Sequence, residues 1–521
     1  MKNLILLLCA VIATSTYRQE TKPLPVKLAI EMAETFVVNA ALKKRPNILF
    51  AIADDMSHAS AYGHNWVSTP HFDKLASEGI LFKNAFTSSP KCAPSRASTL
   101  GGRHFWQMKA ASCHWNVWPN ELKIYTDLLA EAGYHVGLTG KGWGPGEYKK
   151  RGGRVHNPAG KAYNTQKKKT QVGISDNNYS GNFKEFLKKR KLGQPFCFWY
   201  GAREPHRGYA AGSGIRSGLD PKTVKVPSYY PDHADVRSDL LDYALEVNWF
   251  DKHLGEIVEY LREIGELDNT LIIATSDNGA PFPRIKGQIY DEDFSLPMAA
   301  RWGAVHKGGA VVEDFVNNID IGPTFLDAAG VEIPEEMSGR SFVDIFKANR
   351  SGFVDPKRDF VCVGRENQDL GREGDLGYPV RAIRTRDYLY VHNFAPDRWP
   401  VGNPETGFTN CDSSPTKNLI LKLHKESNSQ YFEANFGKRS QEQLFELSVD
   451  SECMKNLAQN PEYSKIKKEL WEQLKTTLID TKDPRILGNG KVFDDYEYIG
   501  SDKAQHSWKA YIEGWWKPQR Y

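Results

Sequence analysis

The sequence has little that would cross-link the chain or attract nucleic acid. It contains 7 cysteines in 521 residues, and no two of them form a C-x-x-C pair. This spacing excludes a disulfide scaffold and a zinc site of the C-x-x-C kind, while one or two disulfides remain open. The 68 basic and 64 acidic residues leave a net charge of only +4. A balance so close to neutral excludes a general nucleic-acid binder, so we expect no nucleic-acid partner.

The chain also lacks long apolar runs, except at its beginning. Residues 4–13 are apolar, follow Lys2 and precede a group of small residues. This pattern is typical of a secretory signal peptide, which we assign to residues 1–15, and it is too short to span a membrane stably. Since no later run has the length and apolarity of a membrane helix, we expect a secreted or periplasmic protein without stable membrane insertion.

Residues 45–380 are expected to form a large α/β domain with a mostly parallel sheet. Short continuous apolar runs are typical of buried parallel strands, and here they alternate with helical patterns. The apolar runs are residues 47–53, 134–138, 196–200 and 271–275, and the helical patterns include residues 125–132 and 238–264.

Residues 381–521 have a different texture and are expected to form a smaller C-terminal α+β subdomain. Alternating residues over 380–391 predict strands of an antiparallel sheet. Residues 443–447 predict a further strand, and residues 466–478 predict an amphipathic helix. The polar stretch 396–440 is expected to be irregular.

Polar residues follow each predicted strand of the larger domain. They are Asp54 and Asp55 after the first strand, Lys141 after the second, His206 after the third, and Asp277 and Asn278 after the fourth. Sites in open α/β sheets lie outside the carboxyl ends of the strands, so these side chains are expected to converge. Their oxygen atoms favour a hard cation such as calcium or magnesium. Asp and Asn are also common turn residues, so this pattern alone leaves a metal site and ordinary turns both open.

A second segment carries more specific chemistry. Residues Cys92-Ala93-Pro94-Ser95-Arg96 form the pattern Cys-x-Pro-Ser-Arg, followed by a helical stretch that ends at Gly102-Arg103. This is the signature of the formylglycine-dependent sulfatases, and the chain resembles that family. The resemblance implies that a maturation enzyme oxidises Cys92 to formylglycine, whose hydrate is the nucleophile. The alternative is an inert cysteine packed at the start of a helix.

Further motifs of the family follow in the expected order. The resemblance implies a calcium ion held by Asp54, Asp55, Cys92, Asp277 and Asn278. It also implies that Arg96, Lys141 and Lys286 neutralise the sulfate, and that His206 protonates the leaving group. The family fold is an alkaline-phosphatase-like, mixed and mostly parallel sheet flanked by helices, with an antiparallel sheet in the C-terminal part. The segments Ser276–Pro283, Pro205–Arg207 and Tyr378–Arg386 resemble the heparan N-sulfatase branch and its bacterial polysaccharide-sulfatase relatives.

One position departs from the family pattern. The family usually has a histidine two residues after the signature lysine, and this chain has Trp143 there. His114 is our candidate for a substitute base, with a structural histidine as the alternative. We also predict that His114, Arg207 and His392 contact a sulfated glycan substrate. The alternative is that they are ordinary core or surface residues.

Two other classes of function stay open from the sequence. A phosphoester or phosphonate hydrolase of the alkaline-phosphatase superfamily would be expected to have further histidine and aspartate ligands, and no histidine lies in either metal motif. A sulfated-glycan-binding protein without catalysis would leave Cys92 unoxidised.

Overall fold

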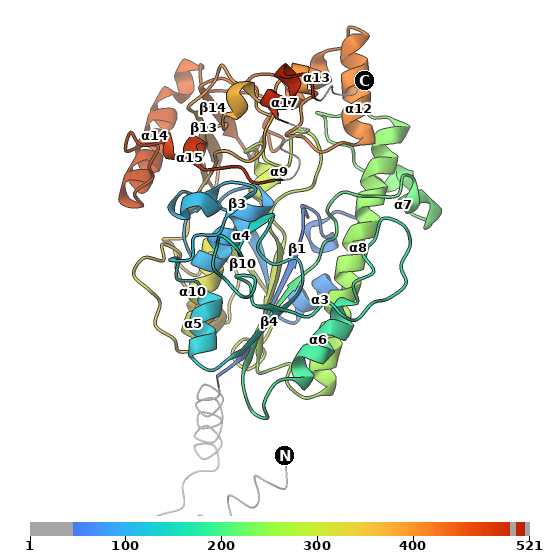
Figure 1. The fold of residues 1–521 in the computed structure, drawn as a ribbon, viewed down its shortest axis with the longest axis vertical. Helices are drawn as coiled ribbons and strands as arrows, with labels where there is room; N and C mark the ends of the chain where they lie inside the picture. The colour runs from blue at the N-terminus through green and yellow to red at the C-terminus, as the bar shows by residue number, and fades with distance from the viewer. Residues whose placement is uncertain (1–44, 501–506, 516–521) are drawn as a thin grey trace, which may run out of the picture. The chain divides into compact units, whose positions relative to one another are not determined.

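The computed structural model describes residues 45–500 and 507–515. The predicted signal peptide, residues 1–15, lies outside the described residues. The centre of the molecule is an eight-stranded sheet in the order β10-β2-β9-β8-β1-β7-β4-β6 (Figure 1). Its strands are β1 Asn47–Ala53, β2 Ile80–Phe86, β4 His135–Gly140, β6 Lys161–Ala162, β7 Phe196–Gly201, β8 Thr270–Ser276, β9 Met298–Arg301 and β10 Ala310–Asn317. All four apolar runs identified in the sequence are strands of this sheet.

The sheet is mixed and mostly parallel, as predicted. Strand β1 pairs in parallel with β7 on one side and with β8 on the other. Strand β9 runs antiparallel to both of its neighbours, β2 and β8. Strands β2, β6, β9 and β10 were not predicted, because their apolar residues are mixed with polar ones or form runs too short to stand out.

Helices cover both faces of the sheet, which explains why its central strand is apolar throughout. Leu49 and Ala51 of β1 enter one core, and Ile48 and Phe50 enter the other. The first core is covered by α3 (Pro70–Ser77), α6 (Tyr179–Lys188) and α8 (Ala234–Glu263). The second is covered by α4 (Cys92–Gly101), α5 (Tyr125–Glu131), α10 (Ile321–Ala328) and α11 (Val343–Ala348). Helices α5 and α8 confirm the two predicted helical patterns.

A second, antiparallel sheet lies in the C-terminal part of the chain. Its order is β11 (Phe360–Arg365), β12 (Val380–Thr385), β13 (Tyr388–Asn393) and β14 (Glu442–Glu446). Helix α14 (Ser464–Asp480) buries Leu470, Leu474 and Leu478 in a cluster with strand residues. The predicted meander, strand and helix are therefore confirmed. Strand β11 precedes residue 380, so this sheet takes one strand from the segment assigned to the larger domain.

The expectation of an irregular segment over residues 396–440 was wrong. This segment contains α12 (Pro415–Lys425) and α13 (Gln430–Asn435). Ser414 caps α12, since its side chain accepts a hydrogen bond from the Lys417 amide. Ile420 and Phe432 pack into the same core as α8. The frequent turn residues around these short helices concealed their apolar faces.

The described residues contain no disulfide and no membrane-spanning helix. The six cysteines that the structure describes are all buried and unpaired, so the disulfides left open by the sequence do not form among them. Among the helices of the described ranges, none combines the length and the apolarity that crossing a membrane requires.

Candidate active site

The predicted polar residues meet at one edge of the large sheet. Strands β8, β1, β7 and β4 are consecutive neighbours in that sheet. Their carboxyl ends carry, in the same order, Asp277 and Asn278, Asp54 and Asp55, the loop to His206, and Lys141. Because parallel strands end at the same edge, residues as far apart in the sequence as Asp55 and Asn278, 223 positions, become neighbours.

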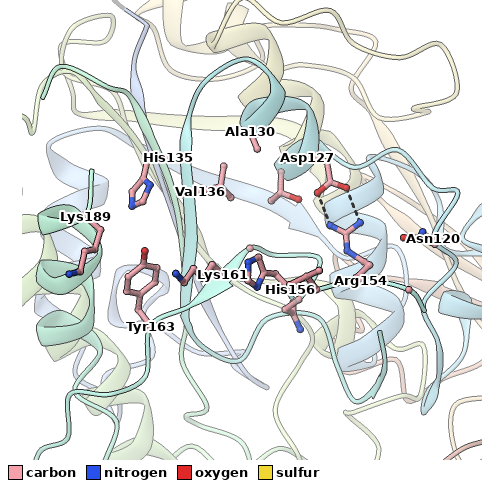
Figure 2. Close-up of a pocket in the computed structure, with 15 residues that line it drawn as sticks. Asn120, Asp127, Ala130, His135, Val136, Arg154, His156, Lys161, Tyr163 and Lys189 are labelled. Carbon is pink, nitrogen blue, oxygen red and sulfur yellow. Dashed lines mark hydrogen bonds and ion pairs between the residues drawn. The ribbon is translucent and has the colours of Figure 1, made fainter. Parts of the chain in front are cut away.

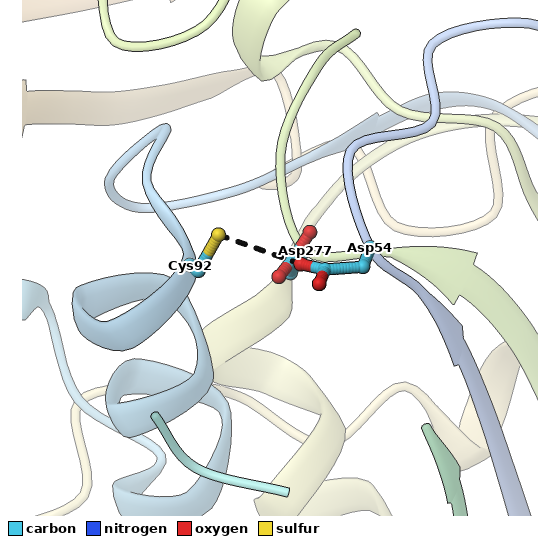
Figure 3. Close-up of side chains that lie close together, drawn as sticks. All are labelled: Asp54, Cys92 and Asp277. Atoms are coloured by element: carbon cyan, nitrogen blue, oxygen red, sulfur yellow. Dashed lines mark hydrogen bonds between the residues drawn. The ribbon is translucent and has the colours of Figure 1, made fainter. Parts of the chain in front are cut away.

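Cys92 begins helix α4 and faces the carboxylates from β1 and β8 (Figure 3). Its Sγ lies 3.4 Å from Asp54 Oδ1 and 3.6 Å from Asp55 Oδ1. The ligand atoms of Asp54, Cys92 and Asp277 all lie within 4.8 Å of one another. Burial raises the pKa of the Cys92 thiol well above its usual value, despite the nearby Lys141. The unmodified thiol is therefore protonated and is a poor nucleophile as it stands.

Arg96 follows Cys92 by one turn of α4 and joins three strand ends. Its fully buried guanidinium donates from Nε to Asp277 Oδ2 at 2.7 Å and lies 3.4 Å from Asp54 Oδ1. Its Nη1 donates to the carbonyl oxygen of Lys141 at 2.8 Å. A planar guanidinium with donors in several directions suits this position, which a lysine would satisfy only in part.

Two lysines complete the charge balance of the site. Lys141 Nζ lies 2.7 Å from both carboxylate oxygens of Asp54, and Lys286 Nζ lies 2.6 Å from Asp55 Oδ2. Burial alone would raise the pKa of Asp54, but Lys141 and Arg96 outweigh it and hold that pKa well below its usual value. Burial raises the pKa of Asp277 to about 7, with Arg96 opposing the shift.

Asn278 provides a test of whether these residues fit a cation. Its Nδ2 donates to Asp55 Oδ1 at 2.8 Å, whereas its Oδ1 is buried without a hydrogen-bond partner. A buried carbonyl oxygen without a donor calls for an explanation such as an ion. Beside it stand the carboxylates of Asp54, Asp55 and Asp277. This set of hard oxygen ligands fits calcium better than zinc.

His206 lies at the mouth of the site. Its Nε2 is 3.9 Å from Asp55 Oδ2, and its side chain is 39% exposed. Its Nδ1 lies 3.0 Å from the carbonyl oxygen of Arg207, and a proton on Nδ1 would satisfy that contact. The pocket next to it has a volume of about 600 Å³. It is lined by Asp54, Lys141, Gly173, Ile174, Ser175, Asp176, Arg203, Glu204, His206, Arg207 and Glu246.

The three residues predicted to contact substrate lie in different surroundings. Arg207 lines the pocket, but its guanidinium forms two hydrogen bonds with Asp239, at 2.8 and 3.0 Å. His114 is buried, and its Nδ1 lies 2.9 Å from Asp369 Oδ1. His392 lies on β13 and stacks on Trp471 of α14, with ring centroids 4.4 Å apart. The structure thus places Arg207 at the pocket and His392 on the second sheet.

Several charged residues of the site were not identified from the sequence. Lys91 is buried, and its Nζ lies 2.6 Å from Asp369 Oδ2, the carboxylate that also pairs with His114. Asp412 Oδ2 lies 3.1 Å from Lys286 Nζ. Lys91 directly precedes Cys92 in the sequence, and this position could have identified it as a residue of the site. Asp369 and Asp412 belong to no motif and reach the site through the folding of the C-terminal part.

Comparisons with known proteins agree with this geometry. Residues 46–331 match the family model described as Sulfatase. An ulvan-active sulfatase of Formosa agariphila is 25% identical over 501 residues, covering 90% of this chain and 79% of its own. The human N-sulphoglucosamine sulphohydrolase is 27% identical over 504 residues, covering 87% and 94%. A solved protein described in complex with its substrate D-glucosamine-2-N,6-O-disulfate shares the fold, with a TM-score of 0.60, 21% identity and coverage of 84% and 99%.

Proposed function

This chain belongs to the sulfatase family of hydrolases, and we propose that it releases sulfate from a sulfated polysaccharide or from its oligosaccharides. The bond broken would be a sulfate ester or an N-sulfo group. The observation that carries the proposal is the position of Cys92 against Asp54 and Asp277, next to a pocket of about 600 Å³. We further propose that the protein is exported, on the basis of its apolar N-terminal segment.

The proposal includes one modification and one metal. A maturation enzyme would convert Cys92 to formylglycine, and a hydrated aldehyde supplies two hydroxyls on one carbon, which a cysteine or serine lacks. Asp54, Asp55, Asp277 and Asn278, with residue 92, would hold calcium, which supplies positive charge to a site whose own charges nearly cancel. The unpartnered Oδ1 of Asn278 supports this assignment.

The chain's own residues would do the remaining work. Lys141 and Lys286 are held by Asp54 and Asp55, so their ammonium groups are in position before an anionic substrate arrives. His206 faces the pocket with an exposed edge, and its contact with the Arg207 carbonyl fixes the ring. A doubly protonated His206 would donate a proton from Nε2 to the departing oxygen or nitrogen of the sugar.

The substrate class is proposed from the named relatives. An ulvan-active sulfatase and an N-sulphoglucosamine sulphohydrolase both act on sulfated saccharides according to their names. No histidine belongs to the Asp54, Cys92 and Asp277 cluster, which favours a sulfatase over a phosphoester hydrolase with histidine ligands.

The decisive experiment measures sulfate release by protein produced together with a formylglycine-generating enzyme. The substrates are heparan sulfate, chondroitin sulfate, carrageenan, ulvan and fucoidan, with calcium present. Mass spectrometry of the Cys92 peptide confirms the modification, and Cys92→Ala is the control. We expect release from at least one polymer that depends on Cys92. Confirmed formylglycine without release from any polymer would contradict the proposal, and hydrolysis of a phosphonate ester instead would favour the phosphoester class.

A further inference from the structure

A second pocket extends along the protein from the end of strand β4 that is opposite to the candidate active site. It has a volume of about 760 Å³, which is within the usual range of ligand pockets. His135 and Val136, the first residues of β4, line it, whereas Lys141 follows the last residue of the same strand. A strand rises about 3.3 Å per residue, so the His135 end of the pocket lies about 20 Å from Lys141. At the other end of the pocket, Asn157 forms two hydrogen bonds with the backbone of Trp143, each of 2.8 Å. The two pockets share no lining residue, so this is a separate site.

The charge of this second pocket is predominantly positive. Arg154, Lys161 and Lys189 line it together with His135, His156 and a single acidic residue, Asp127. Asp127 is neutralised within the wall, since Arg154 donates to its two oxygens at 2.6 and 2.8 Å. Lys161 and Lys189 are exposed and thus contribute two positive charges that no carboxylate of the pocket wall offsets, even with both histidines neutral.

The remaining wall has the chemistry that a sugar requires. Figure 2 shows His135 facing Tyr163, with Lys161 and His156 beside them and the Asp127–Arg154 pair on the far side. Asn120 and Asn157 add amide groups to the lining. Val155 is 81% exposed and offers an apolar surface against which the C–H face of a sugar ring can pack.

We propose that this pocket binds a sulfated saccharide segment of the polymer, apart from the segment in the active site. The inference rests on the proposed function, because it takes the occupant to be part of the same polymer. A sulfated chain brings several negative charges, so a second cationic site that shares no residue with the first would hold the polymer while one sulfate is removed. The pocket contributes to affinity for long chains and leaves the reaction itself unchanged.

The test compares two charge-reversal variants with equal net charge. The pocket variant is Lys161→Glu/Lys189→Glu, and the control is Lys83→Glu/Lys468→Glu, which changes two exposed lysines outside the pocket. Each pair is made in the active protein and in the Cys92→Ala protein. Binding of the preferred polymer and of its chemically desulfated form is measured by calorimetry in the Cys92→Ala background, at 0.05 and 0.3 M salt. Hydrolysis of the polymer and of a sulfated monosaccharide is measured in the active background.

We expect the pocket variant to bind the sulfated polymer roughly tenfold or more weakly than the control, with a smaller difference at high salt because exposed charges are screened. KM for the polymer should rise by a similar factor, while kcat/KM for the monosaccharide stays unchanged. The inference would be overturned if both variants lost affinity for the sulfated polymer equally, or if neither lost affinity. It would also be overturned if the desulfated polymer bound as tightly as the sulfated one. Absence of sulfate release from every polymer by the unmutated, formylglycine-containing protein would instead count against the proposed function, since binding is measured separately in the Cys92→Ala protein.

Discussion

Glu246 offers a direct test of how burial controls charge in the active-site pocket. It lies on α8, lines the pocket and is 3% exposed. Burial, with the charges of Glu204 and Asp242, raises the pKa of Glu246 to about 9. Its carboxyl group is therefore protonated in the folded protein at neutral pH, whereas a glutamate in the unfolded chain titrates near about 4.3. A neutral carboxyl group in this wall also reduces repulsion of an anionic substrate.

The sign of the effect on stability follows from the raised pKa. The folded protein holds this proton more tightly than the unfolded chain does, so the stabilisation is complete below about pH 4.3 and is lost as the pH rises towards 9. Within that window, each rise of one pH unit lowers the free energy of unfolding by about 1.4 kcal/mol. The Glu246→Gln variant keeps the neutral form at every pH. Between pH 5 and pH 8 its stability should therefore rise relative to the unmutated protein by up to about 4 kcal/mol.

Thermal unfolding at pH 5, 6.5 and 8 measures this difference. Unfolding entropy of about 2.1 cal/mol/K per residue amounts to roughly 1 kcal/mol/K for 521 residues, so the Tm difference should grow by up to about 4 °C over this range. Glu263→Gln, an exposed change on the same helix, is the control and should show no such trend. A Tm difference for Glu246→Gln that does not change with pH would refute the reasoning, because Glu246 would then be ionised in the folded protein.

Three further predictions concern the charged groups around Cys92. Arg96→Met leaves the buried carboxylate of Asp277 without its cation, so the free energy of unfolding, measured with denaturant, should fall by about 3–5 kcal/mol. An unchanged midpoint of the denaturant titration would count against this role. Calcium should raise Tm after chelation with EGTA, and Asn278→Ala should reduce that rise; no response to calcium in the unmutated protein would exclude the metal assignment. Asp412→Asn relieves Lys286 of one of its two carboxylates, so KM for the sulfated substrate should fall several-fold with little change in kcat, whereas a higher KM would contradict this expectation.

The parts of the site that follow buried strands were predictable from the sequence. Apolar runs such as residues 47–53 stand out because both of their faces are buried. Parallel strands then bring the residues after them to one edge, so the sequence alone predicts that Asp54, Lys141 and Asp277 lie together. The motif that begins at Cys92 predicts the nucleophile of the site. Both predictions, the residues after the strands and the Cys92 motif, depend on short stretches of sequence that determine the local structure directly.

The contacts supplied by the C-terminal part were not predictable in the same way. Asp412 precedes α12 in a segment expected to be irregular, and its approach to Lys286 depends on how α12 and α13 pack against the first core. Asp369 connects Lys91 to His114 through the two oxygens of one carboxylate. Neither aspartate has a local pattern that distinguishes it from other loop aspartates, because its role arises from contacts between distant segments.

Trp143 shows why a family role cannot be assigned from sequence position alone. Its ring packs against Trp118 in the second core, with centroids 4.9 Å apart, and the side chain is 3% exposed. Gly146 is required beside it, since a Cβ at that position would lie 2.3 Å from the ring. The loop after Lys141 therefore directs this side chain into the core and away from the pocket. Among the described residues that line the active-site pocket, His206 is the one histidine. In the proposed reaction, His206 therefore transfers the proton to the leaving group.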